Sequence, residues 1–143
     1  MKTRILLCLM VLGISSAMAF DKTKPTKNYN SSTAALIEGY AEAKTNYDAN
    51  ILNALLAEDV VVKTGRQTGV LKHGKAELIR FYKKNANVQL NCTTSHELLS
   101  VCDRVVMARV DFQFPEFVQQ NYITMEMNAK GEWKITQVNT FSV

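Results

Sequence analysis

Residues 55–65, "LLAEDVVVKTG", decide the fold, because they change from helical to extended character within a few residues. The two leucines end an apolar helical pattern, and Glu58 and Asp59 form an acidic turn. Val60–Val62 are three consecutive β-branched residues, which disfavour a helix and favour a buried strand. The strand then delivers Thr64 and Gly65, so the question is whether it carries a catalytic group into a pocket or only a threonine hydroxyl.

Helices are predicted before and after this stretch. A helix begins after a cap at Ser31, Ser32 or Thr33, a second follows Asp48, and a third begins at Lys75 after the glycine-rich loop or small ribbon of residues 65–74. From there to the C-terminus the pattern is that of four long strands joined by tight connections. We therefore expect an α+β fold in which a strongly curved antiparallel sheet packs against about three N-terminal helices.

In the last predicted strand, side chains alternate between the two faces, and one face carries both apolar and polar residues. Trp133, Ile135 and Phe141 fall on the same side as Gln137 and Asn139 if the strand is regular. Such a face is apolar at its ends and polar in the middle. This pattern predicts that Trp133 and Asn139 line a pocket.

The N-terminus reads as a secretory signal. Lys2 and Arg4 precede an apolar run, and the small residues ending at Ala19 favour cleavage there. We therefore expect a signal peptide at 1–19, a flexible lead at 20–32 and one domain at 33–143, exported to the periplasm or secreted. Cys92 and Cys102 lie too far apart along one extended strand for a disulfide without a sharp bend.

Composition excludes several classes of partner. The chain has 143 residues and a formal charge of +4, which falls to +2 when Lys2 and Arg4 are removed (4 − 2). Its basic residues are scattered, so nucleic acid is not an expected partner, and neither is a membrane after signal cleavage. The two histidines lie far apart, and the glycines lack a phosphate-loop spacing. We expect no metal and no cofactor.

Three segments in this order resemble one known superfamily. They are "ALIEGYAEAKTNYDANILNALLAEDVVVKTG", "HGKAELIRFYKK" and the closing "GEWKITQVNTFSV". The chain resembles the nuclear transport factor 2-like superfamily, in particular its SnoaL-like and ketosteroid-isomerase-like branch. The resemblance implies a cone-shaped half-barrel with a mostly apolar pocket at its open end, and a homodimer formed through the outer face of the sheet.

The same resemblance lets us compare this sequence with the catalytic residues of the isomerase pattern. The isomerase pattern needs a carboxylate base at the end of the first strand, a tyrosine from the first helix and a protonated acid on a later strand. Tyr40 matches the tyrosine, but Thr64 stands where the base belongs, and Asn121 or Ile123 stands near the acid. A threonine hydroxyl accepts no proton near neutral pH, so that mechanism fails at its first step.

The other candidate bases are His96 and Glu97, which are neighbours on one predicted strand. Their side chains therefore point to opposite faces of the sheet. If Leu99 and Val101 mark the inner face, Glu97 points inward; in the other register His96 does. The predicted pocket-lining residues are Tyr40, Thr64, Phe81, Trp133 and Asn139, and the candidate catalytic residues are Tyr40, Glu97 and His96.

Three functions stay open at this point. The first is a non-catalytic, exported domain that binds a small apolar or amphipathic molecule. The second is an isomerase, cyclase or dehydratase that uses Glu97 or His96 as base and Tyr40 as donor. The third is a dimeric protein-interaction module whose cavity is filled by aromatic side chains.

Overall fold

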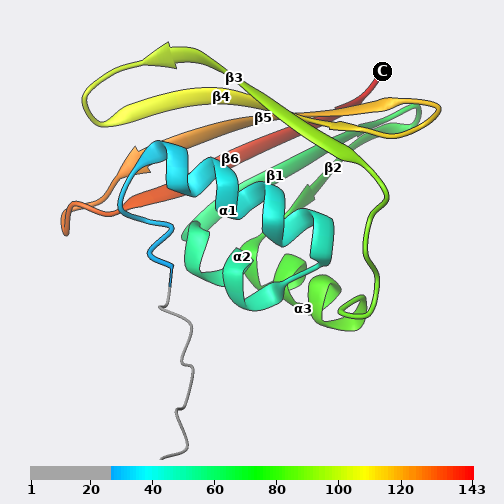
Figure 1. Cartoon of the computed structure of the whole chain (residues 1–143), viewed down its shortest axis with the longest axis horizontal. Coiled ribbons are helices and arrows are strands. Elements are labelled where there is room, and N and C mark those ends of the chain that lie inside the picture. Colours follow the sequence, from blue (N-terminus) through cyan, green and yellow to red (C-terminus); the bar gives the residue numbers. More distant parts are fainter. Residues whose placement is uncertain (1–26) are drawn as a thin grey trace, which may run out of the picture.

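The computed structural model describes residues 27–143, which form three helices and six strands (Figure 1). The predicted signal peptide lies outside the described residues. The helices are α1 (Thr33–Asn46), α2 (Ala49–Leu55) and α3 (Lys75–Lys84). The strands are β1 (Leu56–Arg66), β2 (Gly69–His73), β3 (Thr93–Val101), β4 (Val105–Gln113), β5 (Val118–Met127) and β6 (Trp133–Ser142).

The helix ends are set by local chemistry. Ser32 caps α1, accepting a hydrogen bond from the amide of Ala35, and Tyr47 ends that helix in the left-handed conformation with φ 49°. Asp48 then accepts from the first amides of α2 through its Oδ1, at 2.9 and 3.0 Å. The predicted cap at Asp48 is confirmed. A single residue thus separates α1 from the cap of α2, which keeps both helices on the same face of the sheet (Figure 1).

The strand order is β2-β1-β6-β5-β4-β3. Strands β3 to β6 form the predicted antiparallel meander, which is confirmed. The sheet has six strands, because the glycine-rich segment forms the small ribbon that the sequence left open, with β2 paired to β1. One feature differs from the prediction: the sheet is mixed, because β1 pairs in parallel with β6. This parallel pair joins strands that are far apart along the chain, so no local sequence signal announces it.

A β-bulge in β6 changes which side chains face the helices. Thr124 pairs with Gln137, but Met125 pairs with Ile135, so Thr136 is an extra residue in the ladder. An extra residue reverses the alternation beyond it. Val138 and Thr140 are therefore buried beneath the helices, and the expected face containing Asn139 points the other way.

The core lies between the three helices and one face of the sheet, and the other face carries no helix (Figure 1). The largest fully buried side chains come from both layers and include Leu36, Leu55, Phe112, Ile123, Met125 and Ile135. All nine residues of β3 are exposed, since this edge strand extends beyond the helices.

The segment just before α1, which the sequence assigns to a flexible lead, contacts the domain. Asn30 donates from Nδ2 to the carbonyl of Trp133 at 2.8 Å and to that of Ala54 at 3.1 Å. Tyr29 packs over Gly39, where an added Cβ would lie 2.6 Å from the Tyr29 ring. These contacts tie residues 29 and 30 to α1, α2 and β6.

Cys92 and Cys102 flank β3 at its two ends and are not bonded to each other. In the described part of the chain, no helix has the length and apolar character that crossing a bilayer requires.

Candidate ligand-binding cavity

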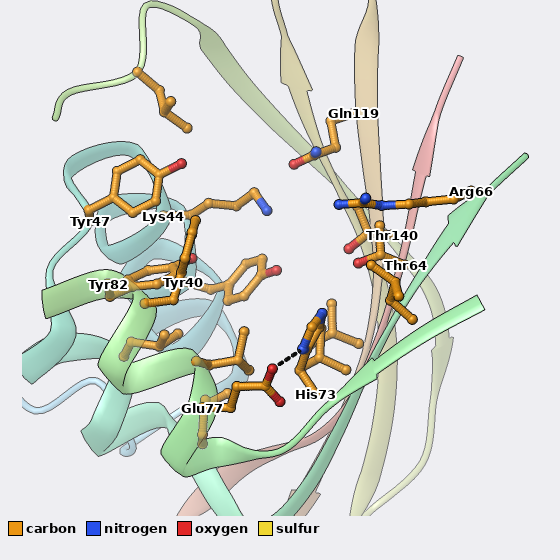
Figure 2. Close-up of a pocket in the computed structure, with 18 of the residues that line it drawn as sticks. Tyr40, Lys44, Tyr47, Thr64, Arg66, His73, Glu77, Tyr82, Gln119 and Thr140 are labelled. Carbon is orange, nitrogen blue, oxygen red and sulfur yellow. Dashed lines mark ion pairs between the residues drawn. The ribbon is translucent and has the colours of Figure 1, made fainter. Parts of the chain in front are cut away.

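A cavity of about 460 Å³ opens between the helices and the inner face of the sheet. This volume lies within the range of small-molecule sites in proteins, about 300–1,000 Å³. Figure 2 shows side chains from α1 and α3 on one wall and from β1, β2, β5 and β6 on the other. The lining residues are Tyr40, Lys44, Tyr47, Leu52, Leu56, Val62, Thr64, Arg66, Leu71, His73, Glu77, Leu78, Phe81, Tyr82, Leu90, Phe114, Phe117, Gln119, Val138 and Thr140.

The strand register orders the sheet wall into rows of increasing polarity. In the first row His73, Val62 and Val138 lie side by side. In the second row, two residues further along β1, Leu71, Thr64 and Thr140 lie side by side, and Asn121 follows on β5. Arg66 and Gln119 come two residues beyond Thr64 and Asn121 on their strands, so they face the same side. Val62 and Val138 thus make the buried end of the wall apolar, whereas Thr64, Thr140, Arg66 and Gln119 make the strand-end side polar; His73 stands at the β2 edge of the first row.

Asn121 is the centre of a buried hydrogen-bond cluster behind the second row. Its Oδ1 accepts from the Tyr40 hydroxyl at 3.0 Å and from Thr140 Oγ1 at 3.0 Å. Lys44 Nζ lies 3.4 Å from the same oxygen. One amide oxygen therefore serves three donors from two elements, α1 and β6, which fixes the position of the phenol and of the amine.

Lys44 reaches the cavity because of its place on α1. Tyr40, Lys44 and Tyr47 lie at spacings of four and three and form one stripe that faces the sheet. Burial lowers the pKa of Lys44 from its ordinary 10.5 to about 8, because a low-polarity environment disfavours the charged form. Its Nζ also lies 5.3 Å from the centre of the Phe112 ring. Among residues 27–143, Lys44 has no carboxylate within ion-pair distance.

The buried tyrosines are neutral donors. Desolvation raises the pKa of Tyr40 well above its ordinary value, and it raises the pKa of Tyr82 as well. Both phenols therefore keep their protons throughout the neutral range, and the Tyr40 hydroxyl serves as a hydrogen-bond donor rather than as a base.

His73 and Glu77 form the one His–carboxylate pair that borders the cavity in the described part of the chain. Nδ1 of His73 lies 2.9 Å from Oε1 of Glu77, four residues later at the start of α3 (Figure 2). The His73 side chain is 29 % exposed and that of Glu77 57 %, so the pair stands at the opening. A carboxylate on Nδ1 orients the imidazole and leaves Nε2 free.

Three of the residues predicted to line a pocket do so: Tyr40, Thr64 and Phe81 border the cavity. Trp133 and Asn139 do not. Trp133 lies at the start of β6, where its carbonyl meets Asn30, and it belongs to the core beneath α1. Asn139 faces outward because the bulge at Thr136 reverses the alternation of β6.

The predicted bases Glu97 and His96 also lie elsewhere. Glu97 pairs across the ladder with Arg109 on the outer face, 3.4 Å from its guanidinium. His96 has the inward register, opposite Val110, but it is exposed where β3 extends beyond the helices. Two strand spacings, about 10 Å, separate its Cα from that of Asn121. Neither side chain borders the cavity, so a base at either position is a wrong prediction for this site.

Sequence reasoning missed or set aside three side chains of the site: Lys44 and His73, which line the cavity, and Asn121, which lies buried behind its wall. Lys44 was recognisable as a cation on the apolar face of a helix, four residues after Tyr40. His73 lies at the end of the glycine-rich segment, which the sequence left open as a loop or a small ribbon, so no inward direction was predicted for its side chain. Asn121 was considered only as a replacement for an acid, not as an acceptor. In residues 27–143 no cluster of three His, Cys, Asp or Glu side chains is arranged to hold a metal ion.

Comparison with known proteins gives matches by structure alone. No protein-family model matches the chain, and no curated protein matches it in sequence. An NTF2-like protein of unknown function from Silicibacter pomeroyi superposes with a TM-score of 0.66 at 17% identity, covering 77% of this chain and 92% of that one. A ketosteroid isomerase-like protein from Erwinia carotovora atroseptica gives a TM-score of 0.58 at 17% identity, with the same two coverages.

A third neighbour is an NTF2-like protein of unknown function in nutrient uptake from Rhodospirillum rubrum. It superposes with a TM-score of 0.59 at 15% identity, covering 78% of this chain and 98% of that one. Assignment to the SnoaL-like branch stays a prediction. The six-stranded curved sheet, the three helices on its inner face and these superpositions together show that the chain has the nuclear transport factor 2-like fold.

Proposed function

We propose that the protein is an exported binding domain that holds a small amphipathic molecule in the cavity between its helices and its sheet. The observation that carries this proposal is the combination of an apolar buried end, with Leu52, Leu56 and Val138, and a polar side with Thr64 and Thr140. A pocket lined mainly by apolar groups with a few placed polar ones is typical of small-molecule sites.

Turnover is the less favoured use of this cavity. Thr64 supplies no base, and the Tyr40 hydroxyl already donates to Asn121. Catalysis of the isomerase type needs a donor aimed at the oxygen on which negative charge develops. A donor held by a buried amide is not aimed at a ligand.

Binding is tested with N-phenyl-1-naphthylamine, a neutral dye that becomes fluorescent in apolar surroundings. We expect saturable fluorescence with the wild-type chain and its loss in Thr64→Trp, which fills the cavity from the sheet wall. Lys63→Trp is the matched control, because Lys63 is the neighbour of Thr64 on the same strand and faces the other side. Equal dye binding by the two variants, both shown to be folded by circular dichroism, would place the dye outside the cavity and refute the proposal.

Export is a separate part of the proposal and rests on residues 1–19. Expression of the full chain in a Gram-negative host should give a periplasmic product whose intact mass corresponds to residues 20–143. A cytoplasmic product that retains Met1 or Lys2 would contradict it.

A second function is favoured by one observation: the His73–Glu77 pair borders the same cavity as Tyr40. An imidazole oriented by a carboxylate is suited to proton transfer, which would allow isomerase, cyclase or dehydratase chemistry with His73 as base in place of Glu97 or His96. The test is conversion of a β,γ-unsaturated ketone to its conjugated isomer, followed by ultraviolet absorbance. A rate that falls about 100-fold or more in His73→Gln would support this function, and the absence of any rate above buffer would count against it.

A further inference from the structure

The charged groups around the cavity do not balance. Two cations, Lys44 and Arg66, line it together with one carboxylate, Glu77, and that carboxylate is held by His73. Figure 2 shows Lys44 and Arg66 extending toward each other from opposite walls, while the His73–Glu77 pair lies toward α3. In the described part of the chain neither cation forms an ion pair. The cavity therefore carries an excess of positive charge on its polar side.

Lys44 has unused hydrogen-bonding capacity. A protonated amine has three N–H donors, and within residues 27–143 its one recorded partner is Asn121 Oδ1 at 3.4 Å. That oxygen already accepts from Tyr40 and Thr140 at 3.0 Å. A desolvated ammonium with one long hydrogen bond is costly unless a negative group approaches it.

Donors outnumber acceptors on the same side of the cavity. The Arg66 guanidinium has five N–H donors and no acceptor, and the Gln119 amide and Thr64 hydroxyl add further donors. Opposite them, Leu52, Leu56 and Val138 offer only apolar contact. The site is thus complementary to a molecule with an anionic head and an apolar body.

We infer that the molecule held in this cavity is an amphipathic carboxylate, whose acid group binds between Lys44 and Arg66 and whose apolar body lies against Leu52, Leu56 and Val138. The inference rests on the proposed binding function and names its ligand class. A carboxylate fits better than a phosphate monoester, which carries nearly two negative charges at neutral pH, because Lys44 belongs to the last turn of α1, where the helix dipole is negative, and Arg66 is exposed.

The test compares three probes with the same ten-carbon chain: decanoate, decan-1-ol and decyltrimethylammonium. Binding is measured by calorimetry at pH 7 with the wild-type protein. A charge-assisted hydrogen bond contributes about 1.5–3 kcal/mol, which corresponds to at least about tenfold in affinity. We therefore expect decanoate to bind at least about tenfold more tightly than decanol, and the ammonium probe to bind more weakly than both.

Lys44→Met removes the charge and keeps the length of the side chain. It should weaken decanoate binding by about tenfold or more and leave decanol binding within about threefold of the wild type. Arg66→Gln should weaken decanoate binding by a few-fold only, with a loss that shrinks in high salt, because this residue is exposed. Lys72→Met is the control: Lys72 is exposed, lies opposite Lys63 of β1 in the strand register and faces away from the cavity. This variant should bind both probes as the wild type does.

The pH dependence of binding gives a second readout. The titratable and charged groups that face the site are Arg66, His73, Glu77, the tyrosines 40, 47 and 82, and Lys44 itself, which also has the Cys92 thiol as a neighbour. As Lys44 loses its proton above pH 8, decanoate binding should weaken in the wild type and stay flat in Lys44→Met.

The failure of this inference differs from that of the proposed function. If decanol binds as tightly as decanoate, or if Lys44→Met leaves decanoate binding unchanged, the cavity binds apolar molecules without charge selection and the inference is overturned alone. If none of the three probes binds, both the inference and the binding function are overturned.

Discussion

The phenol of Tyr40 donates its hydrogen bond to the amide oxygen of Asn121, 3.0 Å away across the gap between α1 and β5. Asn121 is completely buried, and its oxygen is shared with Thr140. An isomerase site of this type needs donors that are free to bind an oxygen of the substrate. In this protein the Tyr40 hydroxyl already has an internal acceptor in Asn121, so the pair is part of the structure.

This pair gives the first prediction. Asn121→Leu leaves the hydroxyls of Tyr40 and Thr140 without an acceptor, so unfolding in urea should show a loss of about 2–4 kcal/mol. Adding Tyr40→Phe removes one of the two unsatisfied hydroxyls, and the double variant should be more stable than Asn121→Leu alone. Gln120→Leu, the neighbour on the outer face, should stay within about 0.5 kcal/mol of the wild type. A double variant less stable than Asn121→Leu would disprove the coupling.

The depressed pKa of Lys44, about 8, predicts a stability that depends on pH. Between pH 8 and the ordinary value of 10.5 the unfolded chain binds more protons than the folded one, so this group makes the free energy of unfolding rise with pH. Below pH 8 Lys44 is protonated in both the folded and the unfolded chain, so the full cost of burying its charge is present. Lys44→Met should therefore be more stable than the wild type at pH 7, by about 1–3 kcal/mol, and the difference should shrink by pH 10. Urea titrations at several pH values, with Lys72→Met as reference, decide this.

At Gly39 we predict that alanine destabilises the domain, although alanine usually favours a helix more than glycine does. Alanine normally stabilises a helix relative to glycine by about 1 kcal/mol, but a Cβ at this position would lie 2.6 Å from Tyr29 and 3.1 Å from Leu55. Gly39→Ala should therefore destabilise the domain by about 1–3 kcal/mol, measured as a lower urea midpoint. Gly65→Ala, with no atom within 4 Å of the added Cβ, is the control and should be close to neutral. The cost at Gly39 should decrease in a Tyr29→Ala background.

The outer face of the sheet predicts a homodimer. It presents Met107, 41 % exposed, and Phe141, 48 % exposed, whose ring meets that of Tyr122 edge to face at 5.6 Å. Light scattering should give twice the mass of one chain, and Phe141→Glu should reduce it to a monomer that still binds the naphthylamine dye. Val88→Glu changes an equally exposed apolar residue in a loop and should leave the dimer intact. A wild-type monomer at every concentration would refute the prediction.

The sequence predicted the layers of this fold better than its side-chain directions. The three helices and the four-stranded meander follow from hydrophobic periodicity and from caps such as Asp48, all of which are local signals. The parallel pairing of β1 with β6 is non-local and left no pattern to find. The bulge at Thr136 had the larger effect on the site, because an assumed regular alternation placed Asn139 inside and Val138 outside.

The candidate site was predicted in part for the same reason. Tyr40, Thr64 and Phe81 border the cavity, since a helical stripe and a strand end are specified by spacing alone. His96 and Glu97 were judged from their alternation, and alternation says nothing of how far a strand reaches beyond the helices that cover it. The sequence places Lys44 on the inner side of its helix, but only the folded structure shows that the described residues offer it no carboxylate.

The pairing of the first strand with the last one has a consequence for how the chain folds during synthesis. β6 lies between β1 and β5 in the middle of the sheet, so the N-terminal half gains its central neighbour only when β6 has been synthesised. Until then β1 and β2 form an isolated hairpin, which is marginal in water. Closure of the sheet around the cavity is therefore a late step, because it needs β6 to be in place between β1 and β5.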